Sequence, residues 1–315
     1  MRTMIATRFG APDVLELQQR ERPQPKRQQL LVQVVATSVN PVDYKIRDHG
    51  QDFGLEPPRV LGFDCSGKVV ETGEDVTRFK EGDEVFFLAN ILDPNGCNAE
   101  YHVVDEATVA PKPAHLSHED AASLPLAGGT AWQALVDRAG VCVGDRVLIH
   151  GAGGVGSLAA QIAVAAGAEV YLSCSDYMVD VAQNWGVKQV INYKTEDFVE
   201  IVNDATDGAG VEIVFNTAGG DLLNRSVPVA AAFGTLVGIL ELDHGLEGAY
   251  RKNLSIELLF LQRDVATLRG LSRLAAAGQL EPVVDSVIPL ADLPEAHRRL
   301  EQGGVKGKIV VCVEE

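Results

Sequence analysis

The chain has 315 residues, 46% of them hydrophobic, and its formal net charge is −17. This length exceeds what one hydrophobic core usually fills, so two domains are expected. The acidic balance argues against a nucleic-acid partner, because binding to a phosphate backbone needs clustered lysine and arginine. The N-terminus is too polar for a signal peptide, and the least polar long stretch, residues 151–168, contains Gln161 and five glycines, so no membrane segment is expected.

The cysteines are five in number and scattered along the chain, and none forms a CxxC pair. Reduced thiols explain this usage better than disulfides do. The sequence therefore predicts a cytoplasmic protein.

Residues 1–118 are expected to form an all-β domain. Short alternating runs, such as Leu30–Ala36 and Gly67–Glu71, are separated by glycine, proline and aspartate turns, for example at 73–76 and 80–83.

From residue 119 the pattern changes to alternating strands and helices. This alternation predicts an α/β fold with a parallel, doubly wound sheet over residues 119–265. A helix near 264–278, a strand near 282–288, a helix that follows Asp292 as its N-cap and leads into 296–302, and a strand at 308–313 are expected beyond it. Apolar runs place the strands of the sheet at 146–150, 169–173, 189–191, 211–216, 233–240 and near 254–260.

The stretch His150–Gly156 is the most informative, because it lies between a strand and a helix expected over 155–166. Its first glycine permits a tight turn, the second lets backbone amides approach a pyrophosphate, and the last lets the helix pack closely on its strand. The alternative is a glycine-rich turn in an unrelated α/β domain. If the stretch binds a dinucleotide, five residues hold phosphates at the helix N-terminus: Gly151, Gly153, Gly154, Val155 and Gly156.

Several blocks, in order and at consistent spacing, resemble the medium-chain dehydrogenase/reductase superfamily, specifically its zinc-independent quinone oxidoreductase branch. The resemblance implies a GroES-like β-barrel domain at 1–118, completed by about 266–315, and a Rossmann domain at 119–265. It also implies a nicotinamide in the cleft between them and a homodimer or homotetramer. The blocks are Gly62–Gly67, Ala99–Tyr101, Gly144–Gly156 and Lys306–Val311.

Zinc-dependent relatives in this superfamily hold a catalytic metal with cysteine and histidine side chains. The matching positions are Asn40, Phe63 and Leu126, and phenylalanine and leucine have no atom that can ligate zinc. The stretch that matches the structural zinc lobe has only Cys97. No zinc is therefore expected, and the favoured substrates are acceptors that take hydride without a Lewis acid, such as quinones and conjugated carbonyls.

The resemblance also assigns three residues to the active site. Asn40 is expected to donate a hydrogen bond near the substrate carbonyl, and Asp43 is either an active-site carboxylate or a cap that orders its loop. The Thr130 hydroxyl is expected to face the cofactor, with a helix-start cap as the alternative. A tyrosine that many relatives place after the Asn40 loop is missing, which weighs against an enoyl-thioester reductase.

Further family positions are expected to contact the dinucleotide. Asn216 and Val237 lie where predicted strands end, which is the edge at which open α/β sheets bind ligands. Tyr193 follows the third Rossmann strand, on the adenosine side. Lys308 matches a position near the cofactor, and the alternative is a lysine that only begins an exposed strand.

The end of the second Rossmann strand favours NADP(H) over NAD(H). NAD enzymes usually place an acidic residue there to bind the ribose 2′-hydroxyl, and the matching residue is Cys174. Ser175 is expected to donate to a 2′-phosphate, and Lys194 is a candidate cation, although Asp176 lies close by.

These observations make the leading hypothesis an NAD(P)H-dependent oxidoreductase that transfers hydride to a quinone, an enone or an enal. One alternative is an alkenal or enoyl reductase that acts on a carbon–carbon double bond. Another is a regulatory or structural member that binds dinucleotide with little turnover. No nucleic-acid or membrane partner is expected.

Overall fold

The computed structural model describes residues 1–242 and 245–313. The chain folds into two compact units, each made of more than one segment. The first unit contains Met1–Leu126, Arg263–Arg273 and residues 282–313. The second contains Ala127–Gln262 and Leu274–Glu281.

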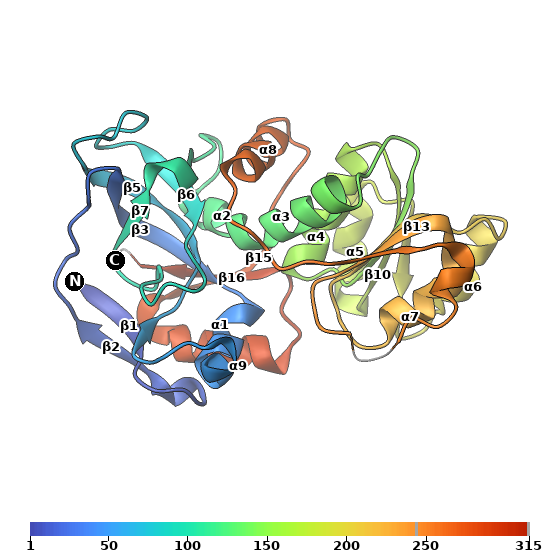
Figure 1. Ribbon diagram of the computed structural model, residues 1–315, viewed down its shortest axis with the longest axis horizontal. Coiled ribbons are helices and arrows are strands. Elements are labelled where there is room, and N and C mark those ends of the chain that lie inside the picture. The colour runs from blue at the N-terminus through green and yellow to red at the C-terminus, as the bar shows by residue number, and fades with distance from the viewer. Residues whose placement is uncertain (243–244, 314–315) are drawn as a thin grey trace. The chain divides into compact units, whose positions relative to one another are not determined.

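Two sheets form the first unit (Figure 1). The smaller has the order β2-β1-β4, with bounds Leu15–Gln19, Arg2–Ala6 and Arg59–Val60. The larger has seven strands in the order β15-β16-β3-β5-β6-β8, and β7 pairs with β3 off this path. Their bounds are β15 Val284–Pro289, β16 Lys308–Cys312, β3 Gln29–Val39, β5 Asp64–Thr72, β6 Glu84–Leu88, β8 Val109–Pro111 and β7 Tyr101–Asp105.

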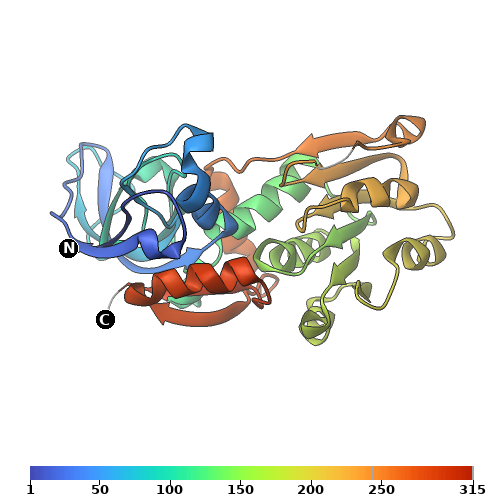
Figure 2. The same cartoon turned by 90° about the horizontal axis from the view of Figure 1, so that it is seen from below.

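Strand β3 is central to the larger sheet because it pairs with β5, β7 and β16. Its apolar residues Leu30, Leu31 and Val32 are fully buried and form part of the core of this unit. Strand β16 runs antiparallel to β3, with Ile309 opposite Val39. Figure 2 shows the red C-terminal segment beside the blue N-terminal segment.

The expectation that residues 1–118 are all-β is wrong at Pro41–His49, which form helix α1. The sequence carries the start signals of a helix there, since Asn40 is the N-cap, proline occupies the first turn and Asp43 closes a capping box. Ile46 is buried on this helix. Helix α1 therefore fixes the backbone that carries Asn40 and Asp43.

The second unit confirms the predicted α/β fold with a parallel, doubly wound sheet. Its six strands follow the order β11-β10-β9-β12-β13-β14, and every neighbouring pair is parallel. Leu148 and Val214 of the sheet pack with Phe198 and Val202 of helix α6, Phe198–Ala205, in one buried cluster. The strand bounds are β9 Arg146–His150, β10 Glu169–Cys174, β11 Gln189–Asn192, β12 Val211–Asn216, β13 Ala230–Gly238 and β14 Ser255–Leu258.

Among the described residues, no helix is both long enough and apolar enough to cross a bilayer. Asp292 precedes α9 as predicted, but its side chain makes no capping hydrogen bond. The remaining helices are α2 His118–Ala122, α3 Pro125–Trp132, α4 Gly154–Ala165, α5 Val179–Ala182, α6 Phe198–Ala205, α7 Leu222–Ser226, α8 Val265–Ala276 and α9 Leu293–Gln302. Shorter helical segments are η1 Pro12–Val14, η2 Gly50–Phe53, η3 Glu106–Thr108, η4 Gln133–Arg138, η5 Asp176–Met178, η6 Gln183–Trp185, η7 Val227–Val229, η8 Ala249–Lys252 and η9 Leu290–Asp292.

Candidate active site

The predicted cofactor residues of the second unit gather at one edge of its sheet, where the parallel strands end. The register places Asn216 opposite both His150 and Gly238, so the three central strands end at the same level. Open α/β sheets bind ligands at this edge. Strands β9 to β13 deliver to it Gly151, Ser175, Tyr193, Asn216 and Val237.

The loop after β9 turns sharply and enters helix α4. Gly151 has φ +93°, in the left-handed region that favours glycine. Gly153 is the N-cap of α4, and no side chain caps the helix there. The first amides of a helix have no partner within the helix, so this uncapped N-terminus offers N–H donors to an anion.

Gly156 and Gly153 of this loop differ in the space that is available for a side chain. A Cβ atom on Gly156 would lie 1.8 Å from the carbonyl oxygen of Gly151, so the start of α4 and the preceding turn can approach each other only without a side chain. A Cβ atom on Gly153 would meet no atom within 4 Å, and the φ of −74° suits other residues. The fold therefore requires Gly156, whereas it leaves open space beside Gly153.

Asn216 organises the turn that follows β12. Its Oδ1 atom accepts hydrogen bonds from the backbone N–H groups of Ala218 at 3.0 Å and Gly219 at 3.1 Å. The hydroxyl of Thr217 donates to the carbonyl oxygen of His150 at 2.7 Å, which ties this turn to the glycine loop. Asn216 therefore shapes the backbone beside the loop, and its contact with a ligand stays a prediction.

Four polar residues follow the ends of β10 and β11, and they make two pairwise contacts. Ser175 Oγ donates to the Tyr193 hydroxyl at 3.0 Å, and Lys194 Nζ lies 2.9 Å from a carboxylate oxygen of Asp176. The hydrogen bond from Lys194 lowers the pKa of Asp176, so this carboxylate stays charged and is offset by the ammonium group. Cys174 differs, because it is buried and burial raises the pKa of its thiol to about 11. The side chain that the sequence matches to the ribose-binding acid therefore lies in the core.

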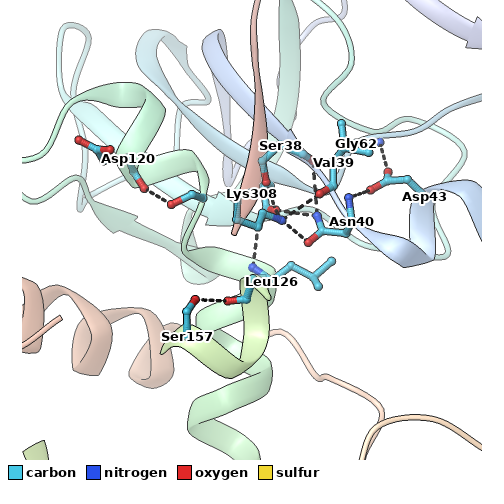
Figure 3. Close-up of polar contacts among 12 residues, drawn as sticks. Ser38, Val39, Asn40, Asp43, Gly62, Asp120, Leu126, Ser157 and Lys308 are labelled. Carbon is cyan, nitrogen blue, oxygen red and sulfur yellow. Dashed lines mark hydrogen bonds and ion pairs between the residues drawn. The ribbon is translucent and has the colours of Figure 1, made fainter. Parts of the chain in front are cut away.

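In the first unit, Asn40 and Asp43 are buried at the start of α1, with 2% and 1% exposure. The Asp43 carboxylate accepts hydrogen bonds from the backbone N–H groups of Asn40 and Gly62, both at 2.8 Å (Figure 3). The first bond belongs to the capping box, so Asp43 does order its loop. Burial raises the pKa of Asp43 to about 7, although both N–H groups act to lower it.

Lys308 begins β16 and is buried, so the alternative of an exposed strand is wrong. Its ammonium group donates to the Val39 carbonyl oxygen at 3.1 Å, to the side-chain oxygen of Asn40, and to Asp64 at 3.3 Å (Figure 3). Burial lowers the pKa of Lys308, whereas the carboxylates of Asp64 and Asp43 raise it.

Asp64 is a site residue that the sequence motifs do not reveal. Fully buried at the start of β5, it accepts hydrogen bonds from Ser38 Oγ at 2.5 Å, Asn40 Nδ2 at 2.7 Å and the backbone N–H of Leu126 at 2.7 Å. One signal is present in the sequence, because Asp64 is the only charged residue in the run 60–67. A lone carboxylate in an otherwise uncharged, buried run needs buried donors to offset its desolvation.

Thr130 lies inside helix α3, not at its start, so the alternative of a helix-start cap is wrong. Phe63 and Leu126, which the resemblance matches to zinc-ligand positions of relatives, are buried hydrocarbon side chains. Within residues 1–242 and 245–313, no group of three or more His, Cys, Asp or Glu side chains is arranged to hold a metal ion.

Two family models match the chain, one in each part of the sequence. Residues 26–114 match the alcohol dehydrogenase GroES-like domain, and residues 185–311 match the zinc-binding dehydrogenase model. The chain is 31% identical to the human mitochondrial NAD(P)H oxidoreductase RTN4IP1 over 329 aligned positions, covering 90% of this chain and 82% of that protein. The chain belongs to the medium-chain dehydrogenase/reductase superfamily.

Solved structures of medium-chain dehydrogenases/reductases share the fold. An NAD-dependent alcohol dehydrogenase is 31% identical with a TM-score of 0.94, and the match covers 100% of both chains. A quinone oxidoreductase from Coxiella burnetii is 35% identical with a TM-score of 0.90, covering 100% of this chain and 99% of that one. The predicted GroES-like and Rossmann folds are confirmed, and the chain is an NAD(P)-dependent oxidoreductase of this superfamily.

Proposed function

We propose that the protein is a zinc-independent reductase that transfers hydride from NADPH to a quinone or a conjugated carbonyl compound. The observation that carries the proposal is the chemistry of Phe63 and Leu126, whose buried side chains have no donor atom for a metal. Without a Lewis acid, the acceptors best served are those that are already electrophilic. Similarity to the Coxiella burnetii quinone oxidoreductase supports this substrate class.

The dinucleotide supplies the hydride when bound, and residues of this chain hold and orient it. We assign the pyrophosphate to the amides at the uncapped start of α4, from Gly153 to Gly156. The nicotinamide half is assigned to the sheet edge at Asn216 and Val237.

The preference for NADP(H) is proposed from the group at the ends of β10 and β11. Ser175 and Tyr193 already share a hydrogen bond, and Lys194 supplies a cation within the same group. Charge-assisted hydrogen bonds from such a group favour a 2′-phosphate. Asp176 opposes this attraction, but its charge is offset by Lys194.

Asn40, Asp43 and Thr130 are the proposed active-site residues. Nδ2 of Asn40 donates to Asp64 at 2.7 Å and to the Ser38 carbonyl oxygen at 3.4 Å. The longer bond is weak, so a substrate oxygen can compete for that hydrogen. A donor aimed at the developing oxyanion stabilises the transition state more than the bound substrate.

A steady-state assay tests the proposal. Oxidation of NADPH and NADH is followed with a panel of quinones, enones, alkenals and an enoyl thioester, and NADP⁺ reduction is followed with simple alcohols. We expect turnover with quinones or enones, faster at low NADPH than at low NADH, and none with alcohols. Turnover confined to alkenals or the thioester would instead favour the carbon–carbon reductase, and tight NADPH binding with no turnover would favour a regulatory role.

We further propose a homodimer formed through strand β14. This strand is at the edge of the six-stranded sheet, and its side chains Ile256 and Leu258 are 42% and 56% exposed. Phe260, just beyond it, is 54% exposed. An apolar sheet edge can pair with the same edge of a second copy, whereas in a monomer it invites aggregation. Light scattering measures the mass of the wild type and of Leu258→Lys. We expect the mass of a dimer for the wild type and the mass of a monomer for Leu258→Lys.

A cytoplasmic location is also proposed, because Cys65, Cys97, Cys142 and Cys174 are free thiols. Fractionation of cells that express the tagged protein tests it.

A further inference from the structure

The Asp64 cluster consists of Ser38, Asn40, Asp64 and Lys308, and no member is more than 5% exposed. Its members come from the end of β3, the N-cap of α1, the start of β5 and the start of β16. The backbone N–H of Leu126, at the start of α3, also donates to Asp64. One carboxylate therefore joins segments that lie far apart in the chain.

Asn40 and Lys308 both donate hydrogen bonds to this carboxylate, and they are also bonded to each other. Asn40 Nδ2 donates one hydrogen to Asp64 at 2.7 Å and the other only weakly to the Ser38 carbonyl oxygen at 3.4 Å, and its Oδ1 accepts from Lys308. The three N–H groups of the Lys308 ammonium match three acceptors, which are the Val39 carbonyl, Asn40 Oδ1 and Asp64. The orientation of the Asn40 amide is thus set from both ends, by Asp64 at nitrogen and by Lys308 at oxygen.

We propose that Asp64 is the positioning residue of the active site, holding the Asn40 amide in the orientation that serves the substrate and keeping the Lys308 ammonium beside it. The reaction part of this inference rests on the proposed function. Asp64 does not touch the reacting atoms in this assignment, because its acceptors face only donors of the chain. Its contribution is the fixed geometry of a donor that would otherwise rotate, which is a requirement for electrostatic stabilisation of an oxyanion.

The substitution Asp64→Asn is the sharpest test, because it preserves shape and removes the charge. Three donors face Oδ2 and one faces Oδ1, so either placement of the new amide directs its NH₂ group at an N–H or O–H donor. Asp285→Asn is the matched control. Asp285 is a partly buried carboxylate of the same unit that accepts from Arg299 at 2.7 Å and from the backbone N–H of Lys306 at 3.0 Å.

The first readout is hydrogen exchange of the Asn40 side-chain amide in the cofactor-free protein, observed by ¹⁵N NMR and assigned by its loss in Asn40→Ser. We expect exchange to accelerate at least about tenfold in Asp64→Asn and to be unchanged in Asp285→Asn. The second readout is kinetic. We expect kcat with the best acceptor to fall roughly 10- to 100-fold in Asp64→Asn, with the Kd for NADPH within about twofold of wild type.

Ser38→Ala keeps the test decisive if Asp64→Asn does not fold. It removes one donor to Asp64 without changing any buried charge, and we expect a smaller acceleration of Asn40 exchange. Unchanged Asn40 exchange in whichever of these variants folds would overturn the proposal, as would an unchanged kcat in Asp64→Asn. A wild type that reduces no acceptor would sink the proposed function, and the exchange measurement would then still decide whether Asp64 orients Asn40.

Discussion

The glycine loop of the second unit and the Asp64 cluster of the first unit both present hydrogen-bond donors, but by opposite means. The loop offers backbone amides at an uncapped helix N-terminus, and all of them come from consecutive residues. The cluster uses buried side chains, and Asn40 and Lys308 within it are 268 residues apart in the chain. Its donors are already bonded to acceptors of the same unit.

This difference determines what a substitution changes. In the loop, a side chain added at Gly153 is expected to fill the space of the ligand, so it should weaken binding. A side chain added at Gly156 would fill space that the backbone needs, so it should destabilise the fold. In the cluster, a lost side chain leaves a buried donor or charge without its partner, which is costly in a medium of low dielectric. Substitutions in the loop can therefore affect cofactor binding and folding separately. Substitutions in the Asp64 cluster are expected to change both the orientation of its side chains and the stability of the fold.

The largest expected effect tests how tolerant the loop is. Gly156→Ala places a Cβ atom 1.8 Å from the Gly151 carbonyl oxygen, so the turn and the start of α4 must move apart. We expect the free energy of unfolding to fall by about 3 kcal/mol, the upper range for overpacking. Urea denaturation measures it. Gly153→Ala is the control, with a change of less than about 0.5 kcal/mol expected. Equal losses in both variants would contradict the packing role of Gly156.

Gly153→Val sharpens the comparison from the other side. The new side chain meets no atom of the chain near its Cβ, so the fold should persist while the phosphate space is filled. We expect the Kd for NADPH to rise about 100-fold, equivalent to about 2.7 kcal/mol of binding free energy. Isothermal titration calorimetry measures the affinity, and circular dichroism checks the fold. A folded variant with wild-type affinity would show that the loop does not hold the pyrophosphate.

The second unit was predictable from sequence because its signals are local. Strands β9 and β12 have the predicted bounds, since each is an apolar run with turn residues at its ends. Strand β13 begins earlier than predicted, at Ala230 instead of 233. Its register with β12 shifts between Val211 and Ile213, and the extra residues include Phe233, which is 76% exposed with φ 64°. A bulge of this kind leaves no period-2 pattern to detect.

The Asp64 cluster was predictable only in part. Asn40 and Lys308 are found through resemblance, and helix α1 could have been found from asparagine, proline and aspartate at its start. The partnership of Asp64 with Lys308 depends on the pairing of β16 with β3. No local pattern specifies a pairing between such distant segments, because register is decided by the packing of the whole sheet.

The pH dependence of the unfolding free energy tests whether burial raises the pKa of Asp43, which lies beside the Asp64 cluster. Burial raises its pKa to about 7 from an ordinary 3.8, so between these values the folded protein holds a proton that the unfolded chain releases. The stability contributed by this proton is complete below pH 3.8 and is lost as pH rises through 7. We expect the unfolding free energy of wild type, relative to Asp43→Asn, to fall by on the order of 1–2 kcal/mol between pH 5 and pH 7. Parallel pH curves for the two proteins would contradict the raised pKa.

A smaller effect is expected where the second unit does use an exposed charge. Lys194→Gln removes the cation and leaves Asp176 without its offset, so we expect NADPH affinity to fall about tenfold and NADH affinity to change little. Lys188→Gln is the matched control, because Lys188 is also exposed and paired with a carboxylate, Glu169 at 3.2 Å, but precedes β11. Equal losses for both dinucleotides would remove Lys194 from the 2′-phosphate site.

The smallest expected effect is that of metal removal. Because the resemblance matches the buried hydrocarbon side chains of Phe63 and Leu126 to zinc-ligand positions, we expect substoichiometric zinc by elemental analysis and activity that is insensitive to chelators. About one zinc per chain, lost together with activity in chelator, would contradict the zinc-independent proposal.

Strand β16 also determines the order in which the two units can finish folding during synthesis. Val39 and Lys308 are bonded across 269 positions of the chain, and all six strands of the second unit are translated within that interval. These strands can pair before β16 leaves the ribosome. Until then, the backbone groups of β3 that β16 later covers and the Asp64 carboxylate must stay hydrated. Although β3 and β5 are made early, the first unit is therefore expected to close after the second.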